Sequence, residues 1–311
     1  MLVLANGSAL ADAYPSRPVR LLVGYAPGGP VDTAARIYAD YLGRVLKQPV
    51  IVDNRAGASG AIAAGMTVSA KPDGYTLYFV ASPTMTMTPL IQKSVSFKPA
   101  QDFSYVGLIT DYTNVLLINK DFPAKNVDEL VTYARKHPGE VSFGSAGVGA
   151  SNHLSAELLA QMTGVKMLHV PYKGSAPAKA AVIAGEVNMT FEPAFTGLPQ
   201  ISSGKLRALA VMSSKRSAVL PDVPTTAELG YPGMEMAAWV GLMAPAGTPT
   251  PIVKKLASEV EHALTDPAVL ETLLKNGAEP AGYYGGAFAA YLRDETARYG
   301  KVIADARIHA D

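Results

Sequence analysis

Residues 19–30 read VRLLVGYAPGGP, an aliphatic run followed at once by proline and glycine. Residues 19–25 predict a buried strand, because short aliphatic and β-branched runs bounded by turn residues are typical of buried strands. Residues 26–30 end that strand, and apolar residues recur at helical spacing from residue 31 to residue 46. The stretch therefore predicts the first strand–turn–helix unit of an α/β fold.

The same alternation continues along the chain. Residues 50–53 predict a second strand, an alanine-rich helix follows the glycines of residues 57–60, and residues 75–80 predict a third strand. Strands that alternate with helices across short loops form a parallel sheet with helices on both faces. The first hundred residues are therefore expected to build one such layered body.

A second layered body is expected after Pro99. Extended segments are predicted at residues 104–109, 114–119, 141–143, 167–170, 187–191 and 206–212, with helices at 127–136, 151–162 and 176–184. One more strand is predicted at residues 237–244, and only helices after it. These helices are expected to pack back on the first body. The prediction is therefore two lobes, residues 14–100 with 226–311 and residues 101–225, each a mainly parallel sheet flanked by helices, joined by two hinge crossings.

Composition excludes several classes of protein. The chain has 311 residues, of which 49% are hydrophobic and 17% charged, with a formal net charge of +1 and no cysteine. Such a neutral chain lacks the basic surface that nucleic acid binding requires. The hydrophobic content excludes a disordered chain. The missing cysteines exclude disulfide scaffolds, thiol nucleophiles and cysteine-ligated metals.

The N-terminus carries part of an export signal. Ala11 and Ala13 form a signal-peptidase site after a short apolar run, although a positively charged start is missing. We interpret residues 1–13 as the remnant of a signal peptide; an ordinary chain terminus is the alternative. No other stretch approaches the roughly 18 apolar residues of a membrane span, so the mature chain is expected to be soluble.

Two glycine-rich loops are the main candidates for binding. Residues 26–30 (APGGP) and 144–149 (GSAGVG) each follow a predicted strand and precede a predicted helix. Glycine lets backbone amides approach a ligand, and a helix N-terminus adds unpaired donors with partial positive charge. Each loop alone also fits an ordinary turn. Together, on two lobes, they predict a clamp for a small carboxylate, at the carboxyl ends of strands where open α/β sheets bind ligands.

Catalytic and metal sites find little support in the sequence. Neither a dinucleotide-binding nor a P-loop motif is present. A hydrolase that uses Ser145 with His153, or with His169, is the alternative, although the surrounding residues fall one short of the nucleophile-elbow motif. His153 and Glu157 have the spacing of a metal pair, but no third ligand is indicated, so no metal or cofactor is predicted. Further polar residues that end predicted strands are Ser82, Thr84, Tyr172 and Glu192.

Several ordered segments resemble the Bug/TctC-type substrate-binding receptors of tripartite tricarboxylate transporters. They include YPSRP at 14–18, YAPGG at 25–29, NRAGASG at 54–60, KPDGYTL at 71–77, GSAGVG at 144–149, HVPYKG at 169–174, GKLRALAV at 204–211 and PDVPT at 221–225. The resemblance implies the two-lobed fold of a class II periplasmic binding protein, often compared to a Venus flytrap. It also implies a periplasmic, monomeric receptor without catalysis or cofactor.

By this resemblance the receptor captures a small carboxylate between its lobes and delivers it to the transporter's membrane subunits; a sensor protein is the alternative partner. The ligand is a di- or tricarboxylate, an aromatic acid or an amino acid, and Glu192 falls near a position that reads amino groups in the family. The expected ligand-binding residues are Tyr25, Gly28, Gly29, Asp32, Ser82, Thr84, Ser145, Ala146, Gly147, Ser151, Tyr172 and Glu192.

Overall fold

The computed structural model describes residues 14–92, 94–172, 174–213, 215–217, 219–275 and 278–306, so the predicted signal-peptide remnant at 1–13 lies outside the described residues. These residues form two compact units. Unit 1 contains the described residues up to Asp111 and the segment Trp239–Arg298; unit 2 contains Tyr112–Ala238 and the described residues from Tyr299 onward. The chain thus leaves unit 1 after Asp111, returns at Trp239 and leaves again after Arg298. The sequence placed two such passages near residues 100 and 225.

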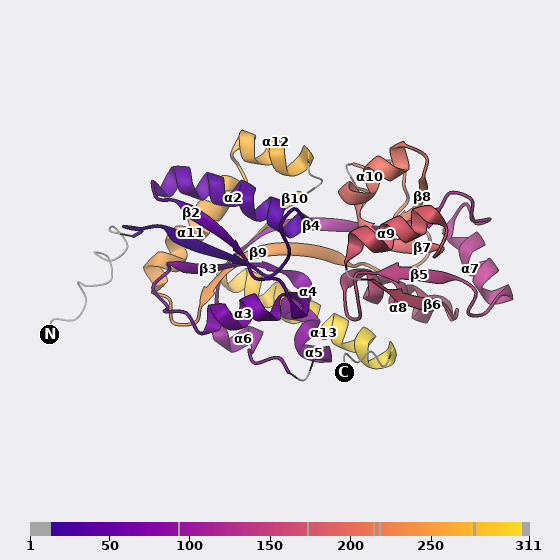
Figure 1. Cartoon of the computed structure of the whole chain (residues 1–311), viewed down its shortest axis with the longest axis horizontal. Coiled ribbons are helices and arrows are strands. Elements are labelled where there is room, and N and C mark those ends of the chain that lie inside the picture. The colour runs from indigo at the N-terminus through magenta and orange to yellow at the C-terminus, as the bar shows by residue number, and fades with distance from the viewer. Residues whose placement is uncertain are drawn as a thin grey trace. The chain divides into compact units, whose positions relative to one another are not determined.

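Unit 1 is built on a parallel sheet whose central strand is the first one predicted. β1 (Val19–Val23) pairs in parallel with both β2 (Val50–Asn54) and β3 (Thr76–Ala81). The connecting helices α2 (Pro30–Leu46) and α3 (Ala61–Val68) cover opposite faces (Figure 1). The crossover through α2 runs from β1 to β2 and the crossover through α3 runs back from β2 to β3, and crossovers of one hand that run in opposite directions across a sheet use opposite faces. The carboxyl end of β1 is therefore a point at which the strand order reverses, where such sheets bind ligands.

Two strands of unit 1 correct the predictions. The extended segments predicted at 104–109 and 114–119 are one strand, β4 (Phe103–Asn119), which runs from unit 1 into unit 2. The expectation of helices alone after residue 244 is wrong, because β10 (Glu279–Tyr284) pairs antiparallel with β4. Pro280 and Gly282 disguise this strand, since both residues are unusual inside strands, and the pairing shifts register between Pro280 and Tyr283.

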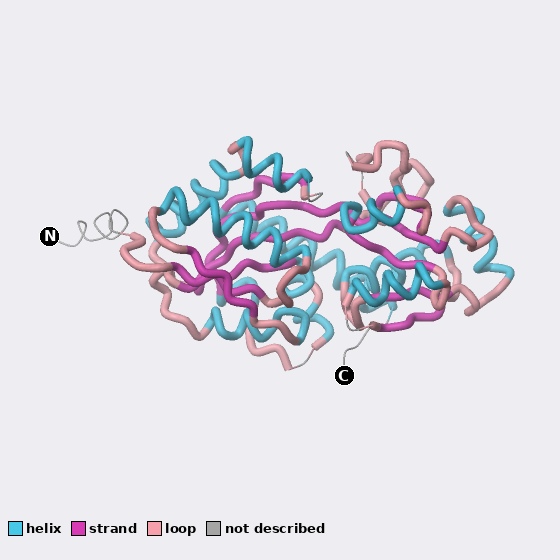
Figure 2. The backbone as a smooth tube through the Cα atoms, turned by 45° about the horizontal axis from the view of Figure 1, so that its top comes forward, coloured by secondary structure: helices cyan, strands magenta, loops and turns pink. Residues whose placement is uncertain are grey.

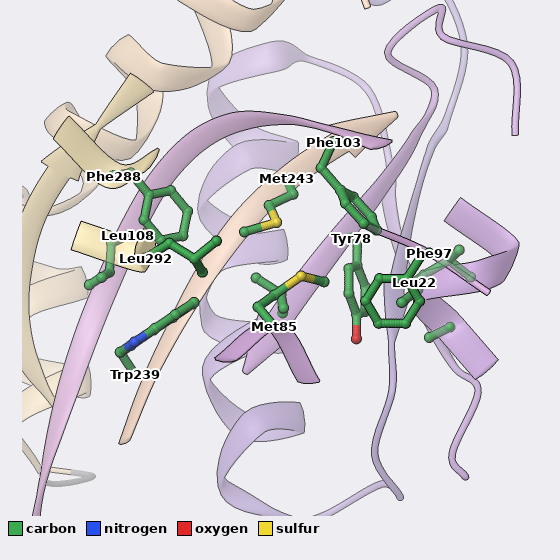
Figure 3. Close-up of a cluster of buried hydrophobic side chains, with 13 residues drawn as sticks. Leu22, Tyr78, Met85, Phe97, Phe103, Leu108, Trp239, Met243, Phe288 and Leu292 are labelled. Atoms are coloured by element: carbon green, nitrogen blue, oxygen red, sulfur yellow. The ribbon is translucent and has the colours of Figure 1, made fainter. Parts of the chain in front are cut away.

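The rest of unit 1 closes its apolar core. β9 (Ala237–Pro245) pairs antiparallel with β3 and lies next to β4. Trp239, Phe288, Tyr78, Phe103 and Met243 belong to one buried cluster (Figure 3). The remaining helices are α4 (Ser82–Thr86), α5 (Thr88–Ile91), α6 (Pro99–Asp102), α11 (Thr250–Ala263), α12 (Pro267–Lys275) and α13 (Gly285–Ala306), with a short 3-10 turn at Ala58–Gly60.

Unit 2 repeats the arrangement. β5 (Ser142–Ser145) is the central strand and pairs in parallel with β6 (Leu168–Pro171) and β7 (Met189–Pro193). The helices α8 (Ser151–Thr163) and α9 (Ser175–Ala184) cover opposite faces of this sheet (Figures 1 and 2). β4 lies between β7 and β8 (Leu206–Val211), antiparallel to both, and α7 (Val127–Lys136) and α10 (Ala194–Ser202) complete the unit. The loop after β5 therefore occupies a second reversal point. The predicted α/β architecture is confirmed.

Candidate functional site

The loop after β1 leads directly into α2. Gly28 has φ +82°, a backbone conformation that side chains rarely adopt, and it is exposed. Gly29 precedes α2 and has no side chain with which to cap the helix. The first amides of α2 are left without an N-cap from this residue, and the helix start keeps its partial positive charge for an anion.

Asp32 holds this loop together from within the chain. The Gly28 amide (2.8 Å) and Arg36 Nε (2.9 Å) donate to its Oδ2, and Asn54 Nδ2 donates to its Oδ1 (2.9 Å). Burial of the carboxyl raises its pKa, but the hydrogen bonds from Arg36, Gly28 and Asn54 outweigh burial and lower the pKa below its usual value. Asp32 therefore stays ionised, and its bonds order the loop.

A second loop of unit 1 lies beside the first. Ala58 and Ser59 have φ of +48° and +52°, which costs about 1–2 kcal/mol at each non-glycine residue. The carbonyl of Ser59 accepts a hydrogen bond from Thr84 Oγ1 at 2.7 Å, and the Tyr25 hydroxyl lies 3.3 Å from the same oxygen. Thr84 and Tyr25, both predicted ligand residues, therefore hold this strained turn in place.

The hydroxyl groups of Ser82 and Thr84 differ in whether their hydrogen is already donated to another residue. Ser82 Oγ accepts a hydrogen bond from the Trp239 amide at 3.3 Å. Among the described residues no acceptor takes the hydroxyl hydrogen of Ser82, whereas Thr84 donates to Ser59. A hydroxyl with an unused hydrogen can donate to a carboxylate.

In unit 2 three amides of the loop after β5 already have side-chain partners. Ala146 N donates to Asn152 Oδ1 (3.0 Å), Gly147 N to Ser145 Oγ (3.1 Å) and Gly149 N to His153 Nδ1 (3.0 Å). Side chains within six residues thus order this loop, as Asp32 orders the loop of unit 1. The residue before α8 is Ala150, which has no polar side chain to cap the helix, so the amides that begin α8 are the donors left for an anion.

Of the two histidines considered as partners for Ser145, the structure places His169 beside it. Ser145 Oγ lies 2.6 Å from Nε2 of His169, while His153 accepts from the loop amide of Gly149. The rings of Phe143, His153 and His169 are stacked, with 4.0 Å between the two histidine centroids. Burial and the neighbouring His153 lower the pKa of His169 to about 4, so its ring is neutral at neutral pH.

Glu192 is the one buried carboxyl among the predicted residues of unit 2. It lies on β7 and is 1% exposed; its Oε2 accepts from Thr196 Oγ1 at 3.2 Å, and its Oε1 has no partner among the described residues. Burial raises its pKa to about 7 despite the nearby Lys179, whose Nζ donates to the carbonyl of Thr196. At neutral pH this carboxyl is therefore present in both protonation states.

The last two predicted residues flank the loop. Ser151 is the first residue of α8 and is half-buried. Tyr172 follows β6, its amide donates to the carbonyl of Ser145 at 2.9 Å, and its side chain packs against the buried cluster around Val182. Ser151 is therefore close to the predicted loop in the sequence, and Tyr172 is brought to it by the pairing of β6 with β5.

Sequence reasoning missed the side chains that order the two loops. Arg36 and Asn54 bind Asp32, and Asn152 and His169 bind the loop of unit 2. The signal available for Asn152 was its place in the first turn of a helix, where a short polar side chain reaches back to loop amides. For His169 the sequence offered only a conceivable triad with Ser145, and the parallel register Phe143↔His169 brings the two residues together.

Searches of the described residues gave two negative results. No helix among them is long and apolar enough to cross a membrane. The same residues contain no cluster of three or more histidine and carboxylate side chains that could hold a metal ion.

Comparison with known proteins identifies the family. Residues 34–308 match the family model described as "Tripartite tricarboxylate transporter family receptor". The chain belongs to this family. The predicted resemblance to Bug/TctC-type receptors is thereby confirmed.

Similar solved structures support the same assignment. The chain is 37% identical to R. palustris Rpa4515, solved with adipate, with a TM-score of 0.88, covering 95% of this chain and 99% of that one. The periplasmic binding protein BugD is 35% identical, with a TM-score of 0.84 and coverage of 96% and 100%. MatC of Rhodopseudomonas palustris, with bound malate, is 34% identical, with a TM-score of 0.83 and coverage of 93% and 100%. The chain thus has the fold of a periplasmic binding protein, and its family and neighbours are solute-binding receptors, not enzymes.

Proposed function

We propose that this receptor captures a small dicarboxylate in the periplasm, as a monomer, and delivers it to the membrane subunits of a tripartite transporter. One observation carries the proposal. In both units the central strand of a parallel sheet ends in a glycine-rich loop at the point where the strand order reverses, and a helix without a side-chain N-cap follows. Open α/β sheets bind ligands at such points.

In unit 1, the contacts offered to one carboxylate come from two places. The amides at the start of α2, after Gly28 and Gly29, provide donors at a positive helix end. The Ser82 hydroxyl provides a hydrogen that has no acceptor among the described residues. Asp32, Thr84 and Tyr25 keep these donors in position through the bonds described above.

In unit 2, the corresponding donors are the first amides of α8 and the hydroxyl of Ser151, beside the ordered loop of Ser145, Ala146 and Gly147. Glu192 bears on ligand choice. As a neutral acid it donates to a second carboxylate, and as a carboxylate it accepts from an ammonium group. With a pKa of about 7 it admits both, and the adipate and malate held by similar receptors favour the dicarboxylate.

A thermal-shift panel tests the proposal. At a concentration of 100 times its dissociation constant, a ligand stabilises the folded chain by about 2.7 kcal/mol, which raises the melting temperature of a chain of this length by roughly 4 °C. We expect adipate or malate to give such a shift, benzoate and glutamate to give less, and dimethyl adipate, which has no charge, to give none.

Two serine variants sharpen the test. Ser82→Ala removes the proposed donor, and Ser69→Ala, at an exposed position after α3 where the hydroxyl donates only to Gly65, is the matched control. Ser82→Ala should weaken binding about 10- to 150-fold and Ser69→Ala should leave it unchanged, since a hydrogen bond to a charged group contributes about 1.5–3 kcal/mol. A panel in which no carboxylate shifts the melting curve would remove the proposal.

A further inference from the structure

Trp239 occupies an unusual place in the chain. It is the sole tryptophan and the residue at which the chain returns to unit 1. Its side chain is 1% exposed, and its ring packs edge-on against Phe288 with the centroids 5.3 Å apart (Figure 3). By its packing Trp239 is an ordinary core residue, but its backbone N–H and its indole N–H each form a hydrogen bond to a polar side chain.

The indole N–H binds a buried carboxylate on α13. Trp239 Nε1 donates to Glu295 Oε2 at 2.7 Å, and Glu295 is 4% exposed. Arg298 Nη2 donates to the other oxygen of the same carboxylate at 2.5 Å. Trp239 and Arg298 are the first and last residues of the C-terminal segment of unit 1. One carboxylate therefore ties together both places where this segment begins and ends.

The backbone N–H of the same residue binds Ser82. This amide donates to Ser82 Oγ at 3.3 Å, and the bond turns an oxygen lone pair of the hydroxyl toward β9. The hydroxyl hydrogen must then point elsewhere, and no described residue accepts it. Trp239 thus sets the direction in which Ser82 can donate.

We infer that Trp239 is a positioning residue for ligand capture: through its amide it orients the Ser82 hydroxyl toward the ligand carboxylate, and through its indole it fixes that orientation to Glu295 on α13. This inference rests on the proposed function, because Ser82 must meet the ligand. The single tryptophan can also report ligand binding through its fluorescence, since a change at Ser82 alters the surroundings of Trp239.

The test compares variants in which the hydrogen bond and the packing are removed separately. Glu295→Leu removes the acceptor of the indole, Glu295→Gln keeps an accepting oxygen, and Phe288→Leu removes ring packing on Trp239 without touching either hydrogen bond. Trp239→Phe keeps an aromatic ring and the amide but loses the indole donor together with part of the buried ring packing, so it serves, read against Phe288→Leu, if Glu295→Leu does not fold. Adipate and malate are the probes, with binding measured by calorimetry and, in variants that retain Trp239, by tryptophan emission.

We expect ligand to shift the emission of the wild type and of Glu295→Gln, which should bind within about twofold of each other. Glu295→Leu and Trp239→Phe should bind about tenfold more weakly, the equivalent of about 1.4 kcal/mol. Phe288→Leu should melt at a lower temperature with an unchanged dissociation constant. The double variant Ser82→Ala/Glu295→Leu should bind like Ser82→Ala alone, because residues that act through one another are not additive.

Three different failures can be told apart. Equal dissociation constants for the wild type, Glu295→Leu and Trp239→Phe would overturn the positioning role and leave the receptor function intact. Additive losses in the double variant would overturn the link to Ser82. If neither adipate nor malate binds the wild type, the proposed function fails for dicarboxylates, and the inference fails with it.

Discussion

Two aspartates on α2 form a matched pair for testing how the loop after β1, the proposed ligand loop of unit 1, is held. Asp32 and Asp40 each precede an arginine by four residues, and each forms an ion pair with it. The side chain of Asp32 is 3% exposed and accepts from Gly28, Arg36 and Asn54, whereas that of Asp40 is 80% exposed and lies 3.8 Å from Arg44. Replacing either with asparagine removes a charge and keeps the size.

The geometry sets the expected loss of stability. An amide has one accepting oxygen and one donating nitrogen, so after Asp32→Asn at least one of the three donors faces another donor. Arg36 is exposed and can turn to water, but the Gly28 amide and Asn54 share the buried carboxylate. A buried donor left unpaired costs about 1–3 kcal/mol, whereas an exposed ion pair contributes about 0.5 kcal/mol or less. We therefore expect Asp32→Asn to lose about 1–3 kcal/mol and Asp40→Asn almost nothing.

Urea unfolding followed by circular dichroism measures this difference, with an unchanged dependence on urea as the sign of an intact two-state transition. The pKa of Asp32 is lower in the folded chain than its usual 3.8, so its contribution is present above that pH and disappears as the pH falls through the folded value. Plots of the free energy of unfolding against pH for the wild type and Asp32→Asn should therefore converge as the pH falls through the folded pKa of Asp32. Equal midpoints for the two variants at pH 7 would refute the reasoning.

Three further predictions concern single positions. Gly60→Ala should lower the free energy of unfolding by about 2–4 kcal/mol, because φ at Gly60 is +90° and the new Cβ would clash with Thr84 Oγ1. Gly139 is the control, because its φ is +82° but no atom lies within 4 Å of the new Cβ. In urea unfolding, Gly139→Ala should lower the free energy of unfolding by only about 1–2 kcal/mol. The pKa of Glu192 is raised from 4.5 to about 7, so wild-type stability contains a term that falls as pH rises through that range, and Glu192→Gln should abolish it. The pKa of His169 is lowered from 6.5 to about 4, so its term has the opposite slope, and His169→Gln should remove a loss seen as pH falls below 6.5. Urea midpoints at pH 4.5, 5.5 and 6.5 separate the two, and a variant whose slope matches the wild type contradicts the corresponding assignment.

The layered architecture could be predicted from the sequence because periodicity carries it. The run at residues 19–30 appears in the structure as β1, its turn and the start of α2, and the second loop follows β5 as expected. β10 escaped prediction because Pro280 and Gly282 break the pattern of a strand, and its existence depends on pairing with β4, which lies far away in the sequence. Local composition does not record such pairing.

The candidate site was predictable in position and less so in mechanism. Two loops at the ends of central strands could be identified from their glycines. The bonds from Gly28 to Asp32 and from Gly149 to His153 span four residues and left a readable signal in the first turn of each helix. The contact of Ser145 with His169 spans 24 residues and follows from the register of β5 and β6, which a single sequence does not reveal.

Amides of the two glycine-rich loops are hydrogen-bonded to side chains of the chain itself, and this changes which donors are expected to bind an anion. Glycine-rich loops were expected to offer their amides to the ligand, yet Gly28, Ala146, Gly147 and Gly149 all donate to the chain's own side chains. A loop that is already hydrogen-bonded loses little conformational freedom when a ligand arrives, and this lowers the entropic cost of binding. The donors that remain are at the uncapped starts of α2 and α8, whose positive ends act over short range. In the proposed function, a chain with a net charge of +1 attracts a carboxylate through rigid local donors, and the ordering side chains, foremost Asp32 and Asn152, should matter for affinity even where they never touch the ligand.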